Sequence, residues 1–480
     1  MSDLIRIAVV GHTNTGKTSL LRTLTRDTRF GEVSGRPGTT RHVEVARLQA
    51  DGRVLLELYD TPGIEDAIDL LSLFDQQSAV SQSAQGSRED GPTRVRRFLE
   101  SVDARQRFEQ EAKVLRQLSH SDAALYVIDA RDPVLAKHRD ELEILSMCGV
   151  PLLPLLNFVS AGQTNEQQWR EVLAGLGLHA IVRFDTVAPP KDGERILYTK
   201  LATLLDAHRK TIETLIRSHE RDARQRHETA MQLIAVLLLE CAAMKLRVSR
   251  EPQAIERGVQ TLNDKVRKRE QACVAQLLSL YRFYPDDIET DTLPLVDGRW
   301  QEDIFDPYTL QNMGIKLGGG AAAGAAAGLG IDLMVGGMTL GAAALTGAML
   351  GGGLQTLRHY GGDLLGKLTG ERALRIDDGI IAALATRQLD LVAALERRGH
   401  AAQQKLARAQ LDSLQSSGEA SVFTVGDLPP PLRMARSHVD WGQDDALMFD
   451  DAAKQQAAAS LAELLERLLE QRYNTPAQEH

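Results

Sequence analysis

Nine consecutive residues near the start of the chain, Gly11 to Ser19, constrain its fold more than any other stretch. They read Gly-His-Thr-Asn-Thr-Gly-Lys-Thr-Ser, between an apolar run at residues 4–10 and a helix-forming run at residues 20–24. A strand, a glycine-rich turn and a helix in this order are typical of the phosphate-binding loop GxxxxGK[ST]. The chain is therefore expected to contain an α/β domain built around a nucleotide site.

Each residue type in this loop has a chemical reason. Gly11 and Gly16 let the backbone curl so that successive N–H groups point at a β-phosphate. Lys17 supplies a positive charge to the phosphate oxygens, and the Thr18 hydroxyl is a Mg²⁺ ligand. The helix that begins near Lys17 adds the positive end of its dipole. The expected loop contacts to the nucleotide are Gly11, Asn14, Thr15, Gly16, Lys17, Thr18 and Ser19.

A second motif follows a predicted hairpin. Strand-like runs at residues 43–48 and 54–59 flank the pair Asp51-Gly52, which suits a tight turn. The second run ends in Asp60-Thr61-Pro62-Gly63. Asp60 can hold Mg²⁺ through water, and the Gly63 N–H can meet a γ-phosphate.

Further strands are expected at residues 123–129, 152–157 and 179–184, with helices at 136–147 and 164–175 between them. Strands that alternate with helices predict a doubly wound, mostly parallel sheet whose ligand lies at the carboxyl ends of the strands. The fold class is thus an α/β P-loop G domain, followed by an all-α C-terminal region.

The composition limits the function classes. The 480 residues carry 56 basic and 65 acidic side chains, a formal net charge of −9, which gives no clear nucleic-acid signal. The three cysteines have neither metal-ligand spacing nor an even disulfide framework. The first residues read as a strand and not as a charged-then-apolar leader, so a cytoplasmic protein is expected.

Together with Pro37-Gly38-Thr39-Thr40-Arg41, the two motifs resemble the translation-factor-related GTPases of the Era and MnmE (TrmE) branch over about the first 190 residues. The resemblance implies GTP and GDP as ligands and Mg²⁺ held by Thr18, Thr40 and Asp60. Thr40 is then the switch I threonine, and the catalytic residues are Lys17, Thr40 and Gly63. Ile64 stands where Ras-like relatives keep a water-positioning glutamine, so low turnover is expected.

The resemblance gives Asn14 two interpretations. It matches a phosphate-loop asparagine that in several relatives helps to hold K⁺, which would make hydrolysis K⁺-stimulated. The alternative is an Asx turn that stabilises the loop. Both stay open at the level of sequence.

The base-reading motif departs from the family pattern. In place of Asn-Lys-x-Asp the chain has Asn157-Phe158-Val159-Ser160. Asn157 is kept as a nucleotide-site residue, but Ser160 replaces a carboxylate whose contact to guanine is worth about 2–4 kcal/mol. A P-loop NTPase of relaxed base specificity is therefore one alternative, and Asp185 near the last strand is a positional candidate for the displaced carboxylate.

The remaining chain is predicted to be helical. A nearly apolar segment at residues 230–244 is expected to be a buried core helix, and a seven-residue stripe from Val259 to Leu280 a packing face. The expected divisions are 1–190, with a mobile insertion at about 76–92, then 191–310 (long helices), 311–355 (Gly/Ala-rich helical hairpin), 356–412 (helical), 413–450 (linker or loop) and 451–480 (C-terminal helix).

In the Gly/Ala-rich stretch at residues 314–353, glycines recur every fourth residue at 320, 324 and 328, at 337 and 341, and at 347 and 351. Small residues at this spacing let helix backbones approach closely. One interpretation is a hairpin with Asp332 at its turn that contacts a membrane, peripheral at the cytoplasmic face of the inner membrane. The other is a hairpin packed inside a soluble bundle. An Era-like domain with such a tail resembles a family of bacterial GTPases of unassigned role.

The sequence thus predicts a GTP-binding protein with slow Mg²⁺-dependent hydrolysis that acts as a nucleotide-controlled switch for its helical region. The alternatives left open are a nucleotide-binding scaffold and a membrane-structural helical protein with little turnover. An unidentified protein partner and a second copy of the chain are candidate partners.

Overall fold

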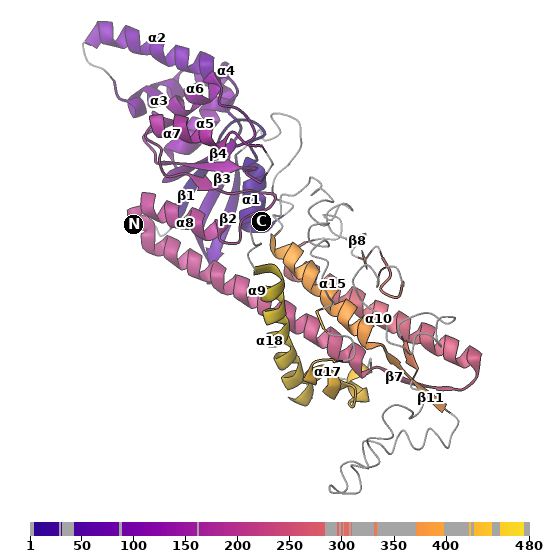
Figure 1. The fold of residues 1–480 in the computed structure, drawn as a ribbon. Helices are drawn as coiled ribbons and strands as arrows, with labels where there is room; N and C mark the ends of the chain where they lie inside the picture. The colour runs from indigo at the N-terminus through magenta and orange to yellow at the C-terminus, as the bar shows by residue number, and fades with distance from the viewer. Residues whose placement is uncertain are drawn as a thin grey trace. The chain divides into compact units, whose positions relative to one another are not determined.

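The computed structural model describes most of the chain and divides it into two compact units, with the main division between Arg224 and Gln225. The described residues are 4–27, 30, 43–85, 89–160, 163–283, 295–296, 299–300, 302–306, 309, 331–333, 371–397, 422–423, 427–443 and 452–474. Each unit has its own arrangement of helices and strands (Figure 1).

The first unit is built on a six-stranded sheet with the order β2-β3-β1-β4-β5-β6. β2 runs antiparallel to β3, and the other neighbouring strands pair in parallel, so the predicted doubly wound sheet is confirmed. The strands are β1 (Ile5–Val10), β2 (Glu44–Ala50), β3 (Arg53–Asp60), β4 (Ala123–Asp129), β5 (Leu152–Asn157) and β6 (Val182–Arg183).

Helices cover both faces of this sheet because side chains of a strand alternate between its faces. Ile7 and Val9 of β1 pack with α1 (Lys17–Thr25) and α8 (Gly193–Leu204). Ala8 and Val10 point to the other face. The helices packed there are α2 (Ala67–Gln85), α3 (Gly91–Glu100), α5 (Glu109–Ser119), α6 (Ala136–Ser146) and α7 (Glu166–Gly175), with the short α4 (Asp103–Gln106) between α3 and α5.

The first unit extends beyond the boundary expected at residue 190. Leu197 and Leu201 of α8 are buried in its core, as are Ile212 and Leu215 at the start of α9 (Arg209–Ala243), which follows the short 3-10 turn η1 (Asp206–His208). The apolar residues that the sequence analysis assigned to a separate helical region therefore complete one face of the sheet.

The insertion expected at residues 76–92 is mostly helical. α2 continues to Gln85, and α3 begins at Gly91 with Asp90 as its N-cap, whose side chain accepts the Thr93 N–H at 2.9 Å. Residues 67–85 contain neither glycine nor proline, and their many alanines, leucines and glutamines favour a helix. The prediction of a loop from the serine and glutamine content of residues 76–85 is therefore wrong.

The second unit is mainly helical. Its core is formed by the second half of α9 together with α10 (Pro252–Leu280), α15 (Asp378–Arg397), α17 (Pro430–Ala435) and α18 (Ala452–Asn474). The predicted stripe on α10 is confirmed, since Val259, Val266 and Cys273 are buried. The predicted core helix at residues 230–244 is also confirmed, and its Glu240 is paired with Arg269 and Lys454.

Small antiparallel strands interrupt the region that was predicted to be all-helical. β7 (Lys245–Ser249) pairs with β11 (Glu371–Ile376), and β11 pairs with β10 (Ile331–Leu333). A separate pair joins β8 (Leu295–Val296) and β9 (Arg299–Trp300). In β7, basic and apolar residues alternate from Lys245 to Val248, and β11 ends with the alternation Leu374-Arg375-Ile376. These short patterns have the period of a strand but little weight beside the long helices.

Two further expectations need correction or lie outside the described residues. Asp332 was placed at the turn of a helical hairpin, but residues 331–333 form β10; the rest of the 314–353 stretch lies outside the described residues. The proline cluster assigned to a linker begins α17 instead, because proline is suited to the first turn of a helix. It is followed by the short 3-10 turn η3 (Val439–Gly442).

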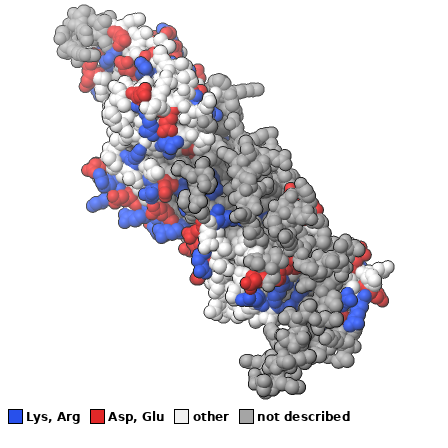
Figure 2. Space-filling view, in the orientation of Figure 1, with Lys and Arg blue, Asp and Glu red and all other residues white. Residues whose placement is uncertain are grey.

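No helix in the described ranges is both long and apolar enough to cross a bilayer. On the visible face of the described residues, acidic and basic side chains lie next to one another (Figure 2). Ion pairs around α3 join Arg97 with Glu89 and Arg94 with Asp75.

Two glycines with positive φ allow a matched test of the fold. Gly11 has φ +141°, and a Cβ there would overlap the Val127 carbonyl oxygen of β4. Gly52 has φ +76° in the confirmed Asp51-Gly52 turn, with no atom within 4 Å of such a Cβ. We expect Gly52→Ala to cost about 1 kcal/mol through backbone strain. Gly11→Ala should cost about 3 kcal/mol or more because the clash adds to the strain.

Urea unfolding of the full chain, followed by circular dichroism, measures both losses. Equal losses for the two variants would contradict the close approach of Gly11 to β4.

Candidate functional site

The phosphate-binding loop lies between β1 and α1, at the carboxyl end of the parallel strands, as predicted. Gly16 is the N-cap of α1 with φ +90°, a conformation that favours glycine. The Lys17 ammonium donates to the carbonyl oxygens of Gly11 at 2.9 Å and His12 at 2.8 Å. These two bonds hold the ammonium over the loop. Burial lowers the pKa of Lys17, while the nearby Asp60 and Glu141 carboxyls oppose that shift.

The two predicted Mg²⁺ ligands from different motifs meet in the structure. The Thr18 hydroxyl donates to Asp60 Oδ2 at 2.5 Å. Burial raises the pKa of Asp60 to about 6, and the Thr18 hydrogen bond and the Lys17 charge act in the opposite direction. Asp60 Oδ1 is buried and has no hydrogen-bond partner among the described residues. A hydroxyl beside a carboxylate with an unpaired oxygen fits a hard cation such as Mg²⁺.

The Asp-Thr-Pro-Gly motif packs directly on the loop. The Thr61 hydroxyl donates to the Val9 carbonyl oxygen at 2.8 Å. A Cβ on Gly63 would come within 2.7 Å of the Thr13 backbone nitrogen, so only glycine fits there. Ile64 is 1% exposed in the core, which removes its side chain from any role at the phosphates. Thr40 lies outside the described residues.

The sequence did not predict a cluster formed by His12 of the phosphate-binding loop with Lys137 and Glu141 of α6. The His12 ring contacts the Ile64 carbonyl oxygen through Nδ1 at 3.0 Å and Lys137 Nζ through Nε2 at 2.8 Å. Lys137 and the buried Glu141 both lie on α6. Burial, and then the Lys137 charge, lower the pKa of His12. Only the fold brings these residues together, since nothing in their spacing marks them.

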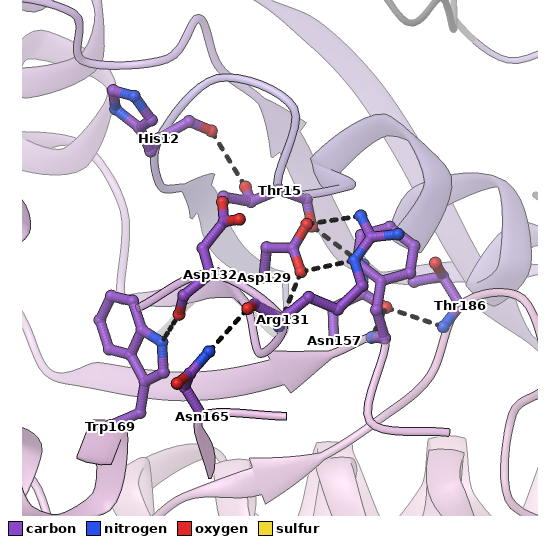
Figure 3. Close-up of polar contacts among 10 residues, drawn as sticks. His12, Thr15, Asp129, Arg131, Asp132, Asn157, Asn165, Trp169 and Thr186 are labelled. Atoms are coloured by element: carbon purple, nitrogen blue, oxygen red, sulfur yellow. Dashed lines mark hydrogen bonds and ion pairs between the residues drawn. The ribbon is translucent and has the colours of Figure 1, made fainter. Parts of the chain in front are cut away.

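Asn157 joins three loops of the site (Figure 3). Its side-chain Nδ2 donates to the Thr15 carbonyl oxygen at 2.9 Å. Its Oδ1 accepts the backbone N–H groups of Phe158 and Thr186, both at 2.9 Å. The side chain is fully buried, so its contacts brace the phosphate-binding loop against the loops that follow β5 and β6.

An aromatic side chain lies beside the phosphate-binding loop, and a guanidinium lies over its ring. The Arg131 Cζ lies 4.1 Å from the centre of the Phe158 ring. Arg131 also binds Asp129 through Nε–Oδ1 at 2.9 Å and Nη2–Oδ2 at 2.6 Å (Figure 3). The Phe158 ring reaches the phosphate-binding loop, since a Cβ on Gly16 would lie 3.2 Å from its Cζ. Asp129 ends a parallel strand, a position that could have marked it as a site residue.

Asp185 has a defined place in the loop after β6. Its Oδ2 accepts the Ser160 N–H at 3.0 Å, and its Oδ1 accepts the N–H groups of Val187 at 2.9 Å and Ala188 at 3.2 Å. The residue is 3% exposed.

The structure thus brings most of the predicted site residues to one edge of the sheet. Lys17, Thr18 and Asp60 meet there, and Asn157 contacts the loop through Thr15. Asn14 is exposed with φ +63°, a left-handed conformation that asparagine tolerates, while Ser19 is buried in α1. The nucleotide contacts of these residues stay predictions.

Two family models match the chain. Residues 6–157 match the family described as 50S ribosome-binding GTPase, so this part is a G domain of the GTPase class. Residues 170–463 match the family described as domain of unknown function (DUF3482). No curated protein matches the chain.

Solved structures that match include Era, as expected from the sequence, whereas likeness to the MnmE branch stays a prediction. An Era variant from Aquifex aeolicus bound to GDP and AlF4⁻ is 17% identical with a TM-score of 0.30, over 42% of this chain and 57% of that chain. Era in complex with MgGDPNP and a 16S ribosomal RNA fragment is 16% identical with a TM-score of 0.30, over 41% and 56%.

The G domain of the T. maritima FeoB iron transporter is 19% identical with a TM-score of 0.24, over 42% of this chain and 98% of that chain. The chain spans a little over half of the length of the two Era structures.

Proposed function

We propose that this chain, which belongs to the DUF3482 family, is a GTP-binding switch that hydrolyses GTP slowly in the presence of Mg²⁺. The observation that carries the proposal is the meeting of Lys17 with the Thr18–Asp60 pair on a phosphate-binding loop. A G domain of the GTPase class around this loop supports guanosine phosphates as the ligand.

The chain's own residues would act by position and charge. Lys17, held by two loop carbonyls, has a third N–H to donate to a phosphate oxygen. Thr18 and Asp60 would hold Mg²⁺, which supplies positive charge to the phosphate oxygens when it is bound. Gly63 lies against the loop at Thr13, where its N–H would meet the terminal phosphoryl group.

Slow turnover follows from the residue after Gly63. The Ile64 side chain is buried in the core and has no polar atom with which to orient an attacking water. A polar side chain that does contact Ile64 is His12. Its ring contacts the Ile64 carbonyl oxygen and Lys137. A low rate suits a switch, because the triphosphate state then persists long enough to be read by a partner.

Replacing Lys17 tests the switch against a scaffold that keeps nucleotide only as a structural ligand. We expect Lys17→Ala to abolish GTP turnover and to weaken GTP binding at least about a hundredfold, since a charge-assisted contact is lost. Isothermal titration and phosphate release measure the two quantities. The exposed Lys191→Ala is the matched control and should leave both unchanged. Unchanged turnover in Lys17→Ala would refute the proposed site.

We further propose that K⁺ stimulates hydrolysis through Asn14, which is exposed on the loop in a left-handed conformation. If so, GTP turnover should be at least about tenfold faster in KCl than in NaCl, a barrier difference of about 1.4 kcal/mol. Asn14→Ala should remove that difference. Equal rates in the two salts would favour the alternative in which Asn14 only stabilises the loop.

We also propose that the Gly/Ala-rich stretch 314–353 brings the protein to a membrane, at the cytoplasmic face. Its four-residue glycine spacing supports this, since small residues at that spacing allow close helix packing in lipid. Glycine costs about 1 kcal/mol per residue in an aqueous helix, so such a stretch needs lipid or tight packing.

Flotation with liposomes of neutral and anionic phospholipid tests this proposal. We expect the full chain to float and a variant with residues 334–353 replaced by a Ser/Gly linker of equal length to remain at the bottom. This design keeps β10, which pairs with β11. If neither protein floats, the hairpin packed inside a soluble bundle is supported; if both float, residues 334–353 are not what brings the protein to the membrane.

A further inference from the structure

We propose that Asp185, on the loop that follows β6, is the residue that reads the guanine base in this G domain. The inference rests on the proposed nucleotide site and adds a specificity-determining residue to it. It answers the departure at Ser160, where the family pattern has a carboxylate and this chain has a hydroxyl.

The first argument is where the carboxylate lies. Asp185 Oδ2 accepts the backbone N–H of Ser160 at 3.0 Å. Position 160 has no carboxylate of its own. The Asp185 carboxylate, from another loop, lies against its backbone N–H instead. Asp185 Oδ1 accepts the N–H groups of Val187 and Ala188, so the carboxylate cannot rotate freely.

The second argument is how this loop is tied to the phosphate-binding loop. Thr186, the next residue, donates its N–H to Asn157 Oδ1 at 2.9 Å, while Asn157 Nδ2 donates to Thr15. The Thr23 hydroxyl of α1 donates to the Thr186 carbonyl oxygen at 3.1 Å. Asp185 is thus held at a fixed place relative to the loop that would hold the phosphates.

The third argument is that the neighbouring carboxylate is already neutralised. Asp129 is engaged by the guanidinium of Arg131 through both of its oxygens. The hydrogen bonds of Asp185 come from the backbone N–H groups of Ser160, Val187 and Ala188, although its charge also acts on Arg131. Oδ1 accepts two of these bonds and Oδ2 one, so Oδ2 keeps a lone pair for a ligand. The Thr186 hydroxyl, buried without a hydrogen-bond partner in the described part of the chain, gives the same loop a second polar group.

The chemistry of this arrangement selects guanine. A carboxylate accepts hydrogen bonds from the guanine N1–H and 2-amino group together, and it repels the N1 lone pair of adenine. The Arg131 guanidinium lies over one face of the Phe158 ring, so the other face is the one that would be left for a purine to stack on. Stacking alone would accept any purine, so the carboxylate would be the source of selectivity.

The wild-type full chain gives the first test, by isothermal titration with GDP, IDP and ADP in the presence of Mg²⁺. IDP lacks only the 2-amino group, so we expect it to bind about 10- to 100-fold more weakly than GDP. ADP should bind at least about 100-fold more weakly than GDP. Equal affinities for the three would overturn the role of Asp185 and leave the nucleotide site standing. Failure of all three to bind would overturn the proposed function itself.

The second test is Asp185→Asn, with xanthosine diphosphate as an added ligand. Xanthine has a carbonyl in place of the 2-amino group, which an asparagine amide can bind. We expect the variant to bind this ligand at least about tenfold more tightly than GDP, the reverse of the wild-type order. A residue that merely fastens the two loops would weaken every nucleotide equally, and that result would refute the proposal. Asp192→Asn, exposed at the start of α8, is the matched control and should keep the wild-type order.

Discussion

The buried side-chain amide of Asn157 is the interaction on which the geometry of the site depends. One donor and one acceptor atom of this residue tie together loops from three different β–α connections. An unsatisfied buried polar group costs about 1–3 kcal/mol, so each of these loops is held in place by the cost of breaking its bond to Asn157. The phosphate-binding loop and the loop that carries Asp185 are consequently parts of one hydrogen-bonded unit and not two independent mobile segments.

The position of the Asn157 amide also explains why Gly16 and Phe158 lie beside it. Gly16 lies so close to the Asn157 amide and to the Phe158 ring that a side chain there would displace one of them. Phe158 has φ +55°, an unusual conformation for an aromatic residue, which turns the chain immediately after the braced asparagine. Local strain is thus located at the point where the strand ends and the site begins, as is common for binding sites.

The parts of the fold that the sequence predicts well are those in which one local feature is decisive. The loop from Gly11 to Ser19 is recognised from its glycines and Lys17, and the Asp51-Gly52 turn from the need for two positive φ angles. The strands β7 and β11 were missed because a short alternation has little weight beside helices of 29 and 35 residues. Asp185 was a candidate from its position alone. Its contact with Ser160 and the contact of His12 with Lys137 could not be derived, since each joins residues more than twenty positions apart whose spacing has no motif.

A chain of polar contacts inside the first unit leads from the end of α1 to α9. α1 begins at Lys17 and ends near Arg26, whose guanidinium binds Glu194 of α8 at 2.9 Å. Glu194 also contacts His219 of α9 at 3.2 Å. α9 then continues without a break to Ala243, and its last turns are in the core of the second unit. Within the first unit, the end of α1 is thus joined to α8 and to the first half of α9 through Glu194.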